Sequence, residues 1–225
     1  MAKAPARQTA AKKATARKAA AKKPAARKRT AAAPQGAPGK PVSNLPVPKR
    51  TTLDPDLQKY FAICEEKLGL VPAVLEAYAY KPQRLRNFMA AYNDLMLGEP
   101  GLSKLEREMI AVVVSCCNRC YYCLVAHGQA VRQYSGDPTL GEALVMNYRV
   151  ARLSERHRAM LDFAWKMTAT PFDVNEADRQ RLRDAGFSAS DLFDIYEVTA
   201  FFNYTNRMAH GMEMMPNLDY HVLSR

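Results

Sequence analysis

Acidic residues are absent from the first 50 positions of this chain, although these positions hold fourteen of its 33 lysines and arginines. The remaining 175 residues therefore carry 19 basic residues against 22 acidic ones. The formal net charge of +11 thus belongs to the N-terminal segment, and the rest of the chain is slightly acidic. We expect two parts, a disordered basic tail with a Pro-rich linker over residues 1–52 and a folded domain over residues 53–225.

Three further absences narrow the class of protein. No apolar run is long enough to cross a bilayer, and the start of the chain lacks the apolar core of a secretory signal, so we expect neither membrane insertion nor secretion. No stretch shows a convincing alternation of polar and apolar residues, which excludes a β-rich fold and predicts an all-α domain. The five cysteines are an odd number and do not suggest a disulfide framework, so we expect the reducing environment of the cytoplasm.

Ala, Lys, Arg and Pro dominate residues 1–40, so this segment cannot bury an apolar core and its like charges repel one another. Its composition resembles that of the basic tails of histones and of bacterial histone-like proteins. We therefore expect residues 3–50 to contact the phosphates of nucleic acid without reading its sequence, which would associate the protein with the nucleoid. Two alternatives stay open, a transit peptide that targets an organelle and an incidental or solubilising tail.

Prolines and capping residues divide the body of the chain into helices. Ser103 and Glu106 form a capping-box pattern, which predicts that a helix begins there. The run from Met109 to Val114 is apolar on every side, so this helix should be buried. The other helices are expected to begin at or beside Pro55, Pro72, Pro82, Cys120, Pro138, Ser154, Asn175 and Ser188.

One stretch, Glu108 to His127, concentrates the reactive residue types. On a helix of about 100° per residue, Cys120, Cys123 and His127 fall within roughly 60° of one another, so two thiols and an imidazole share one face. Glu108 cannot join them on the same straight helix, because a rise of about 1.5 Å per residue would place it almost 30 Å from His127. We therefore predict that the chain reverses near residues 118–119, where Asn is a common cap and turn residue.

These residue types suit redox chemistry at sulfur. A cysteine attacks only as the thiolate, which a helix N-terminus, a neighbouring Arg119 and an imidazole all favour. His127 can accept the thiol proton while Glu108 orients and polarises the ring. The second cysteine can then resolve a sulfenic acid or a mixed disulfide. Cys120 is nearer the helix N-terminus, but we expect Cys123, one turn from His127, to be the thiol that the relay serves. The alternative interpretation is a pair of buried cysteines with a core histidine.

Two segments resemble a known superfamily. The sequence Leu102-Ser-Lys-Leu-Glu-Arg-Glu108-Met-Ile-Ala and the pattern Asn118-x-Cys120-x-Tyr122-Cys123-x-x-x-His127 are similar to the alkyl hydroperoxidase D / carboxymuconolactone decarboxylase superfamily, and most of all to its peroxidase-related branch. The likeness covers roughly Leu53 to Met215, including the stretch from Ala200 to Arg207. The branch that opens lactones by decarboxylation generally lacks the cysteine pair, so the pair indicates the thiol branch.

The resemblance implies a helical bundle, a homo-oligomer and thiol-dependent reduction of hydroperoxides. By residue-by-residue match, it assigns the relay to Glu108 and His127 and the redox pair to Cys120 and Cys123. The implied partners are a hydroperoxide substrate and an external dithiol or thioredoxin-like reductant, and no cofactor is implied. Alkyl hydroperoxidase D itself has a second histidine inside the cysteine pair, where this chain has Tyr122, so the route of the proton is expected to differ.

A competing set of residues is Cys117-x-x-Cys120-x-x-Cys123-x-x-x-His127, which resembles a ferredoxin ligand run and could also hold zinc. Such ligands converge from loops, whereas these lie in helix-forming sequence. On one helix Cys117 is about 60° from Cys120 on the side away from Cys123, so we do not expect a metal. A second class of function is accordingly a nucleic-acid-associated or metal-binding module with a vestigial redox site.

The remaining candidates are expected to be structural or exposed. Cys64 should lie in the core, and Cys116 and Cys117 at the end of a buried helix, where cysteine behaves as a small hydrophobe. His157 and His210 are expected at the surface, although His210 could approach the site from the last helix, and His221 lies near the C-terminal end.

The last long helix leaves two questions open. Its aromatic segment, Phe201 and Phe202, suits either a core or a subunit interface. Asn203, Tyr204 and Asn206 could line a pocket or form a polar seam between helices.

Overall fold

The computed structural model describes residues 41–99 and 101–225, and within these residues it contains helices and no strand. The all-α class predicted from the sequence is therefore confirmed. The expected tail, residues 1–40, lies outside the described residues, so its predicted contact with nucleic acid stays a prediction. None of the described helices is long and apolar enough to cross a membrane.

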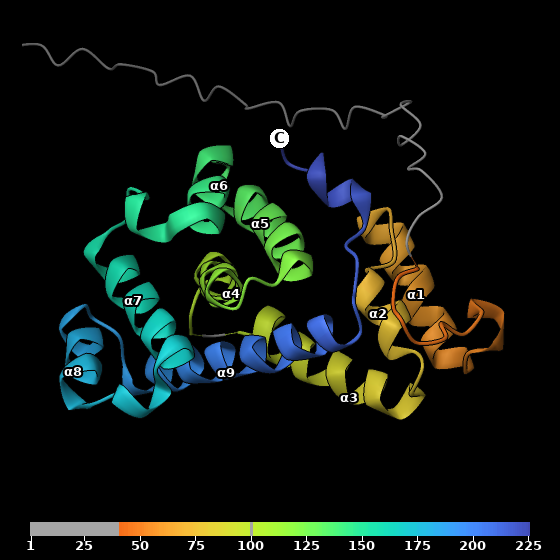
Figure 1. Cartoon of the computed structure of the whole chain (residues 1–225), viewed down its shortest axis with the longest axis horizontal. Coiled ribbons are helices and arrows are strands. Elements are labelled where there is room, and N and C mark those ends of the chain that lie inside the picture. Colours follow the sequence, from red (N-terminus) through yellow and green to blue (C-terminus); the bar gives the residue numbers. More distant parts are fainter. Residues whose placement is uncertain (1–40, 100) are drawn as a thin grey trace, which may run out of the picture. The chain divides into compact units, whose positions relative to one another are not determined.

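The described chain folds into α-helices joined by short turns (Figure 1). Their bounds are α1 Pro55–Leu68, α2 Ala73–Tyr78, α3 Pro82–Tyr92, α4 Lys104–Cys117, α5 Tyr121–Ser135, α6 Pro138–Asn147, α7 Glu155–Ala169, α8 Glu176–Asp184 and α9 Ala189–Gly211. Five short segments complete the structure: the π-helical η2 Asn93–Leu97 and the 3-10 segments η1 Arg50–Thr52, η3 Tyr148–Val150, η4 Pro171–Asp173 and η5 Leu218–His221.

Local capping explains where several helices begin. At the start of α4, the Ser103 hydroxyl accepts a hydrogen bond from the Glu106 amide at 3.2 Å, and the Glu106 carboxylate accepts one from the Ser103 amide at 2.8 Å. The same reciprocal arrangement begins α8 at Asn175 and α9 at Ser188. These bonds satisfy amides that have no partner inside the helix, so the capping residues found in the sequence do set these boundaries.

Helix α4 lies at the centre of the helical domain. It packs against α5, α6, α7 and α9, which surround it when it is viewed end-on (Figure 1). Every residue from Met109 to Val114 is 0% exposed, as its continuous apolar run predicts. Two neighbouring carboxylates on α4 are also buried, and burial of a charge is costly unless a partner compensates for it. Arg156 pairs with Glu106 at 3.1 Å, and the partner of Glu108 belongs to the site described below.

Two apolar clusters form the core. One surrounds α4, and the other joins α1, α2 and α3 to the start of α5 and the end of α9. The second cluster includes Leu57, Leu85 and Phe88, and it also contains Cys120 and Cys123. The cysteine pair therefore lies inside packed structure.

Residues 41–53, expected to form a Pro-rich linker, make defined contacts where they are described. The Asn44 amide donates to the Met212 carbonyl at 2.9 Å, and its side chain donates to the Gly211 carbonyl at 3.1 Å. Ser43 is buried. This segment thus runs along the C-terminal end of α9 and helps to enclose the space beside it.

Candidate active site

The turn between α4 and α5 creates the site. Arg119 adopts a left-handed conformation with φ of 55°, which is uncommon for a residue with a side chain. Its amide donates to the Cys116 carbonyl at 3.1 Å, and the Cys120 amide donates to the Ser115 carbonyl at 2.9 Å. This is the pair of bonds that closes a helix in a Schellman motif. The chain therefore reverses where the sequence predicts, and α5 returns beside α4.

The reversal brings Glu108 and His127 together. His127 Nδ1 lies 2.6 Å from Glu108 Oε2. Because a carboxylate can only accept, Nδ1 carries the proton and Nε2 is the basic nitrogen of the neutral ring. Phe202 packs edge-on against the imidazole, with ring centroids 4.6 Å apart and an interplanar angle of 82°. The ring is thus fixed in orientation by one hydrogen bond and one aromatic contact.

The two cysteines meet at the N-terminus of α5. Cys120 is the residue that caps this helix and Cys123 lies in its first turn; they are 1% and 3% exposed, and neither forms a disulfide. A hydrogen bond from the Cys123 thiol lowers the pKa of Cys120 to about 7, and the Cys123 backbone amide and the charges of His210 and His127 act in the same direction against burial.

The same hydrogen bond has the opposite effect on the pKa of its donor, Cys123. It raises the pKa of Cys123 well above the ordinary value of a thiol, and burial adds to the effect, while hydrogen bonds from Asn206 and Ser115 partly oppose it. Above about pH 7 the reduced pair therefore holds one proton, with the thiolate on Cys120 and the thiol on Cys123. The two sulfurs titrate as a unit because each controls the charge of the other.

A polar seam supports the turn from behind. The Asn118 side chain donates to the side chains of Asn206 at 3.0 Å and Asn203 at 3.1 Å. Asn206 is fully buried and donates to Ser115 at 3.0 Å. Of the two roles that the sequence left open, these asparagines fill the seam between helices, whereas Tyr204 is exposed.

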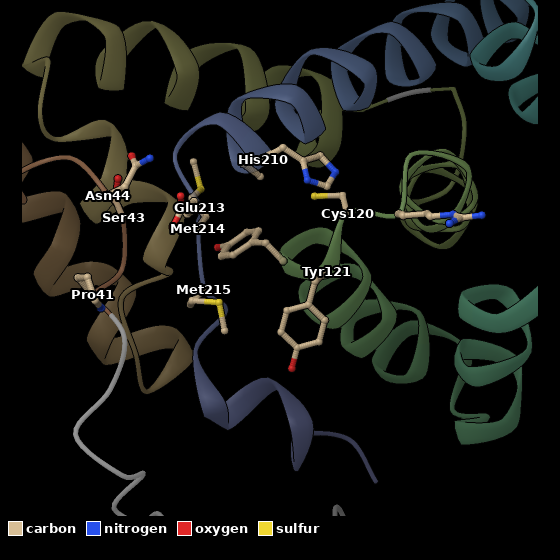
Figure 2. A pocket seen from close by; sticks show the side chains of 12 residues that line it. Pro41, Ser43, Asn44, Cys120, Tyr121, His210, Glu213, Met214 and Met215 are labelled. Atoms are coloured by element: carbon tan, nitrogen blue, oxygen red, sulfur yellow. The ribbon is translucent and has the colours of Figure 1, made fainter.

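The two sulfurs open onto different cavities. The first, which we call the relay pocket, has a volume of about 260 Å³ and is lined by Glu108, Cys123 and His127. The second, which we call the His210 pocket, has a volume of about 620 Å³ and is lined by Cys120 and His210 (Figure 2). The wall shared by the two pockets is formed by Tyr122, Ala209 and Met214. The remaining walls of the relay pocket are mostly aromatic and apolar, and they include Phe88, Tyr92, Phe201, Phe202 and Tyr220.

Tyr122 has a structural role in this arrangement. Its hydroxyl accepts a hydrogen bond from the Val74 amide at 3.0 Å, which ties α5 to the start of α2. The side chain is buried between the two pockets. At the position where the resemblance places a second histidine, this chain therefore has a buried tyrosine that separates the two pockets.

His210 is the residue whose part in the site the sequence left open. It was expected at the surface, and it is exposed, but its Nε2 atom lies 3.0 Å from the Asn118 carbonyl oxygen and its ring points toward Cys120 (Figure 2). Asn118 and His210 are far apart in the sequence, so no local pattern reveals their contact. The other two histidines lie elsewhere, with His157 near Glu106 and His221 beside Tyr121.

The other cysteines are placed as expected. Cys64 is buried, although it also lines the relay pocket, and Cys116 and Cys117 are half-buried at the end of α4. Burial raises the pKa of all three thiols. Within residues 41–99 and 101–225, no three Cys, His, Asp or Glu side chains are grouped closely enough to hold a metal ion.

Comparison with known proteins identifies a matching family and solved structures with the same fold. Residues 82–164 match the Carboxymuconolactone decarboxylase family. An uncharacterized peroxidase-related protein from Silicibacter sp. TM1040 is 59% identical, with a TM-score of 0.81 over 84% of this chain and 99% of that one. The alkylhydroperoxidase AhpD core of an uncharacterized peroxidase-related protein from Ralstonia eutropha JMP134 is 41% identical, with a TM-score of 0.81 over 83% and 98% of the two chains.

The debrominase Bmp8 shares the fold alone, at 18% identity and a TM-score of 0.68 over 80% of this chain and 94% of that one. No match is found among curated proteins. The high identity and near-complete coverage of the two peroxidase-related structures, together with the family match over α3 to α7, decide the relationship. The chain belongs to the carboxymuconolactone decarboxylase family, among its peroxidase-related, alkylhydroperoxidase D-like members.

Proposed function

We propose that the protein is a thiol-dependent peroxidase that reduces hydroperoxides through Cys120 and Cys123. The observation that carries the proposal is the position of Cys123 in the relay pocket, which it shares with the hydrogen-bonded pair of His127 and Glu108. Membership among peroxidase-related proteins supports the same chemistry. A buried carboxylate hydrogen-bonded to an imidazole is the arrangement that lets the ring accept a proton from a thiol as the sulfur attacks.

Formation and resolution of the sulfenic acid together use one proton from each thiol. His127 takes the first proton from the pair, and the remaining proton moves from Cys123 to Cys120 along their hydrogen bond as Cys123 attacks the distal oxygen of the hydroperoxide. The O–O bond breaks, the sulfur is oxidised to a sulfenic acid, and the alkoxide leaves as an alcohol with the proton held by His127. Glu108 stabilises the positive charge that His127 carries between the two transfers.

The second cysteine then resolves the sulfenic acid. Cys120 attacks the Cys123 sulfur, and hydroxide leaves as water with the proton that Cys120 held. The product is a Cys120–Cys123 disulfide, which an external dithiol reduces to restore both thiols. The two sulfurs already interact in the reduced protein, so the disulfide requires little movement of α5.

Trapping of the sulfenic acid tests this assignment. Reduced Cys120→Ser and Cys123→Ser proteins are mixed with one equivalent of an organic hydroperoxide and dimedone, and the modified residue is located by mass spectrometry. We expect a dimedone adduct at Cys123 in the first variant and none at Cys120 in the second. An adduct at Cys120 alone would reverse the roles of the cysteines, and full turnover with a dithiol in both variants would refute the mechanism.

A second proposal concerns the basic N-terminal segment. We propose that residues 3–50 hold the protein on nucleic acid, because fourteen cations without any acid precede a body with more acidic than basic residues. Such a segment binds phosphates independently of sequence and does so more weakly as salt increases. The proposal would place a peroxide-reducing domain beside a target of oxidative damage.

A further inference from the structure

His210 occupies a fixed position beside the catalytic turn. It lies in the last turn of α9, where the Glu213 amide donates to the His210 carbonyl at 3.1 Å and the Met214 amide donates to the Ala209 carbonyl at 2.9 Å. Its own Nε2 atom donates to the Asn118 carbonyl at 3.0 Å. The backbone of His210 is thus held by the end of α9, and its ring is held by the turn that carries Cys120.

This hydrogen bond defines which nitrogen can handle a proton. Because Nε2 donates to a carbonyl, Nδ1 carries the lone pair of the neutral ring. The ring and the Cys120 sulfur point toward one another in the His210 pocket (Figure 2). The positive charge of His210 lowers the pKa of Cys120 more than that of His127 does. The titratable or charged groups that share this pocket with His210 are Arg119, Cys120, Tyr121, Tyr122 and Glu213.

We propose that His210 is a second acid–base group, dedicated to Cys120, and that the His210 pocket is where a dithiol reductant exchanges with the disulfide. The inference rests on the proposed peroxidase function. It assigns oxidation of the cysteine pair by hydroperoxide to one histidine and reduction of the disulfide by a dithiol to the other. His127, with Glu108, serves Cys123 and the hydroperoxide in the relay pocket. His210 serves Cys120 and the reductant on the other side of Tyr122.

The exchange balances as two thiol–disulfide steps. A thiolate of the reductant attacks Cys120 in the disulfide, the S–S bond breaks, and Cys123 leaves as a thiolate that takes a proton from His127. The second thiol of the reductant gives its proton to solvent and attacks the mixed disulfide, so Cys120 leaves as a thiolate stabilised by protonated His210. Two electrons pass from the dithiol to the pair, and the reductant becomes a disulfide.

The shape of the pocket restricts the reductant. Cys120 is only 1% exposed, so a thiol must enter the pocket to reach its sulfur. Met214 and Met215 line the pocket together with residues 43–44, and methionine side chains adapt readily to a variable partner surface. A small dithiol or a narrow cysteine-bearing segment of a protein satisfies these limits, and the two sources are separated by experiment.

The test measures the two half-reactions separately in full-length wild-type, His210→Gln and His157→Gln proteins. Glutamine can still donate to the Asn118 carbonyl but cannot exchange a proton, so the variant removes the proposed role and keeps the structural bond. Reduced proteins receive one equivalent of hydroperoxide, and oxidised proteins receive dithiothreitol or reduced thioredoxin over a range of pH. Thiol alkylation followed by mass spectrometry reports the state of each cysteine with time.

We expect His210→Gln to slow reduction of the disulfide by at least about tenfold, to move the pH profile of Cys120 alkylation upward, and to change the rate of oxidation by less than about twofold. His157→Gln should match the wild-type protein in all three. A greater loss with thioredoxin than with dithiothreitol would assign the pocket to a protein reductant, and equal losses would assign it to a small dithiol.

An unchanged reduction rate and alkylation profile in His210→Gln would overturn the inference, as would equal slowing of both half-reactions. If hydroperoxide fails to oxidise the wild-type pair, the proposed peroxidase function fails first. The disulfide can then be formed with diamide, and its reduction still tests His210.

Discussion

Replacement of Glu108 by glutamine tests the relay most directly. The two side chains have nearly the same shape, and a glutamine oxygen can still accept a hydrogen bond from His127 Nδ1. The change therefore removes charge and leaves the contact at 2.6 Å in place. Because Glu108 is only 5% exposed, water cannot substitute for the lost carboxylate, and the protonated form of His127 loses its stabilising partner.

The size of the effect follows from the worth of a hydrogen bond to a charged group, which is about 1.5–3 kcal/mol. Since about 1.4 kcal/mol corresponds to a factor of ten, formation of the Cys123 sulfenic acid should slow by roughly 10- to 100-fold. The charge of His127 also helps to lower the pKa of Cys120. The pH profile of thiol alkylation should therefore move upward in the variant.

A quenched-flow assay of reduced protein with an organic hydroperoxide, followed by alkylation and mass spectrometry, measures the single oxidative turnover. Glu106→Gln is the matched control, because Glu106 is a buried carboxylate on the same helix whose partner is Arg156. The control should lose stability without loss of the oxidative rate. If Glu108→Gln keeps the wild-type rate and alkylation profile while its circular dichroism is unchanged, Glu108 is only a core carboxylate and the relay is wrong.

Three further predictions follow from the structure. The rate at which iodoacetamide alkylates Cys120 should rise with pH through a midpoint near pH 7. Cys123→Ala should move that midpoint upward, because the thiol that donates a hydrogen bond to Cys120 is lost. An unmoved midpoint would contradict the hydrogen bond between the two sulfurs. Asn206→Ala should cost about 1–3 kcal/mol, since it leaves buried polar partners unsatisfied, and should lower the thermal midpoint by about 2–4 °C per kcal/mol. An unchanged thermal midpoint would contradict the role of the polar seam. On duplex DNA, six to eight phosphate contacts would give a slope of log K against log salt of about −5 to −7. A chain beginning at Pro41, which keeps the residues that line the His210 pocket, should lose most of this binding while it keeps peroxide reduction. Equal retention of DNA by both proteins across a salt series would refute the role of the tail.

The sequence was sufficient for the parts of the site that depend on local geometry. The helical spacing of Cys123 and His127 correctly places them on one face of α5, and capping residues locate the helices. Cys120 was wrongly expected on the same face, because it is the extended residue before the helix and lines the His210 pocket instead. Even the contact of Glu108 with His127 could be inferred, because a straight helix would hold them too far apart.

The rest depends on packing between distant segments, which periodicity does not describe. His210 reaches Cys120 only because α9 ends beside the α4–α5 turn, and Asn206 meets Asn118 for the same reason. The position of the thiolate also escaped sequence reasoning. The spacing favoured Cys123 as the thiol beside the relay, but the hydrogen bond between the two sulfurs places the resting negative charge on Cys120.

That resting charge has an electrochemical consequence. Below pH of about 7 the reduced pair carries both protons, and the midpoint potential of the disulfide should fall by about 59 mV per pH unit, as for any couple of two electrons and two protons. Above this pH only one proton accompanies the two electrons, so the slope should halve to about 30 mV. An ordinary dithiol, with a thiol pKa near 8.5, keeps the steeper slope over that interval. As the surroundings become more alkaline, a cellular dithiol therefore gains driving force to reduce this disulfide.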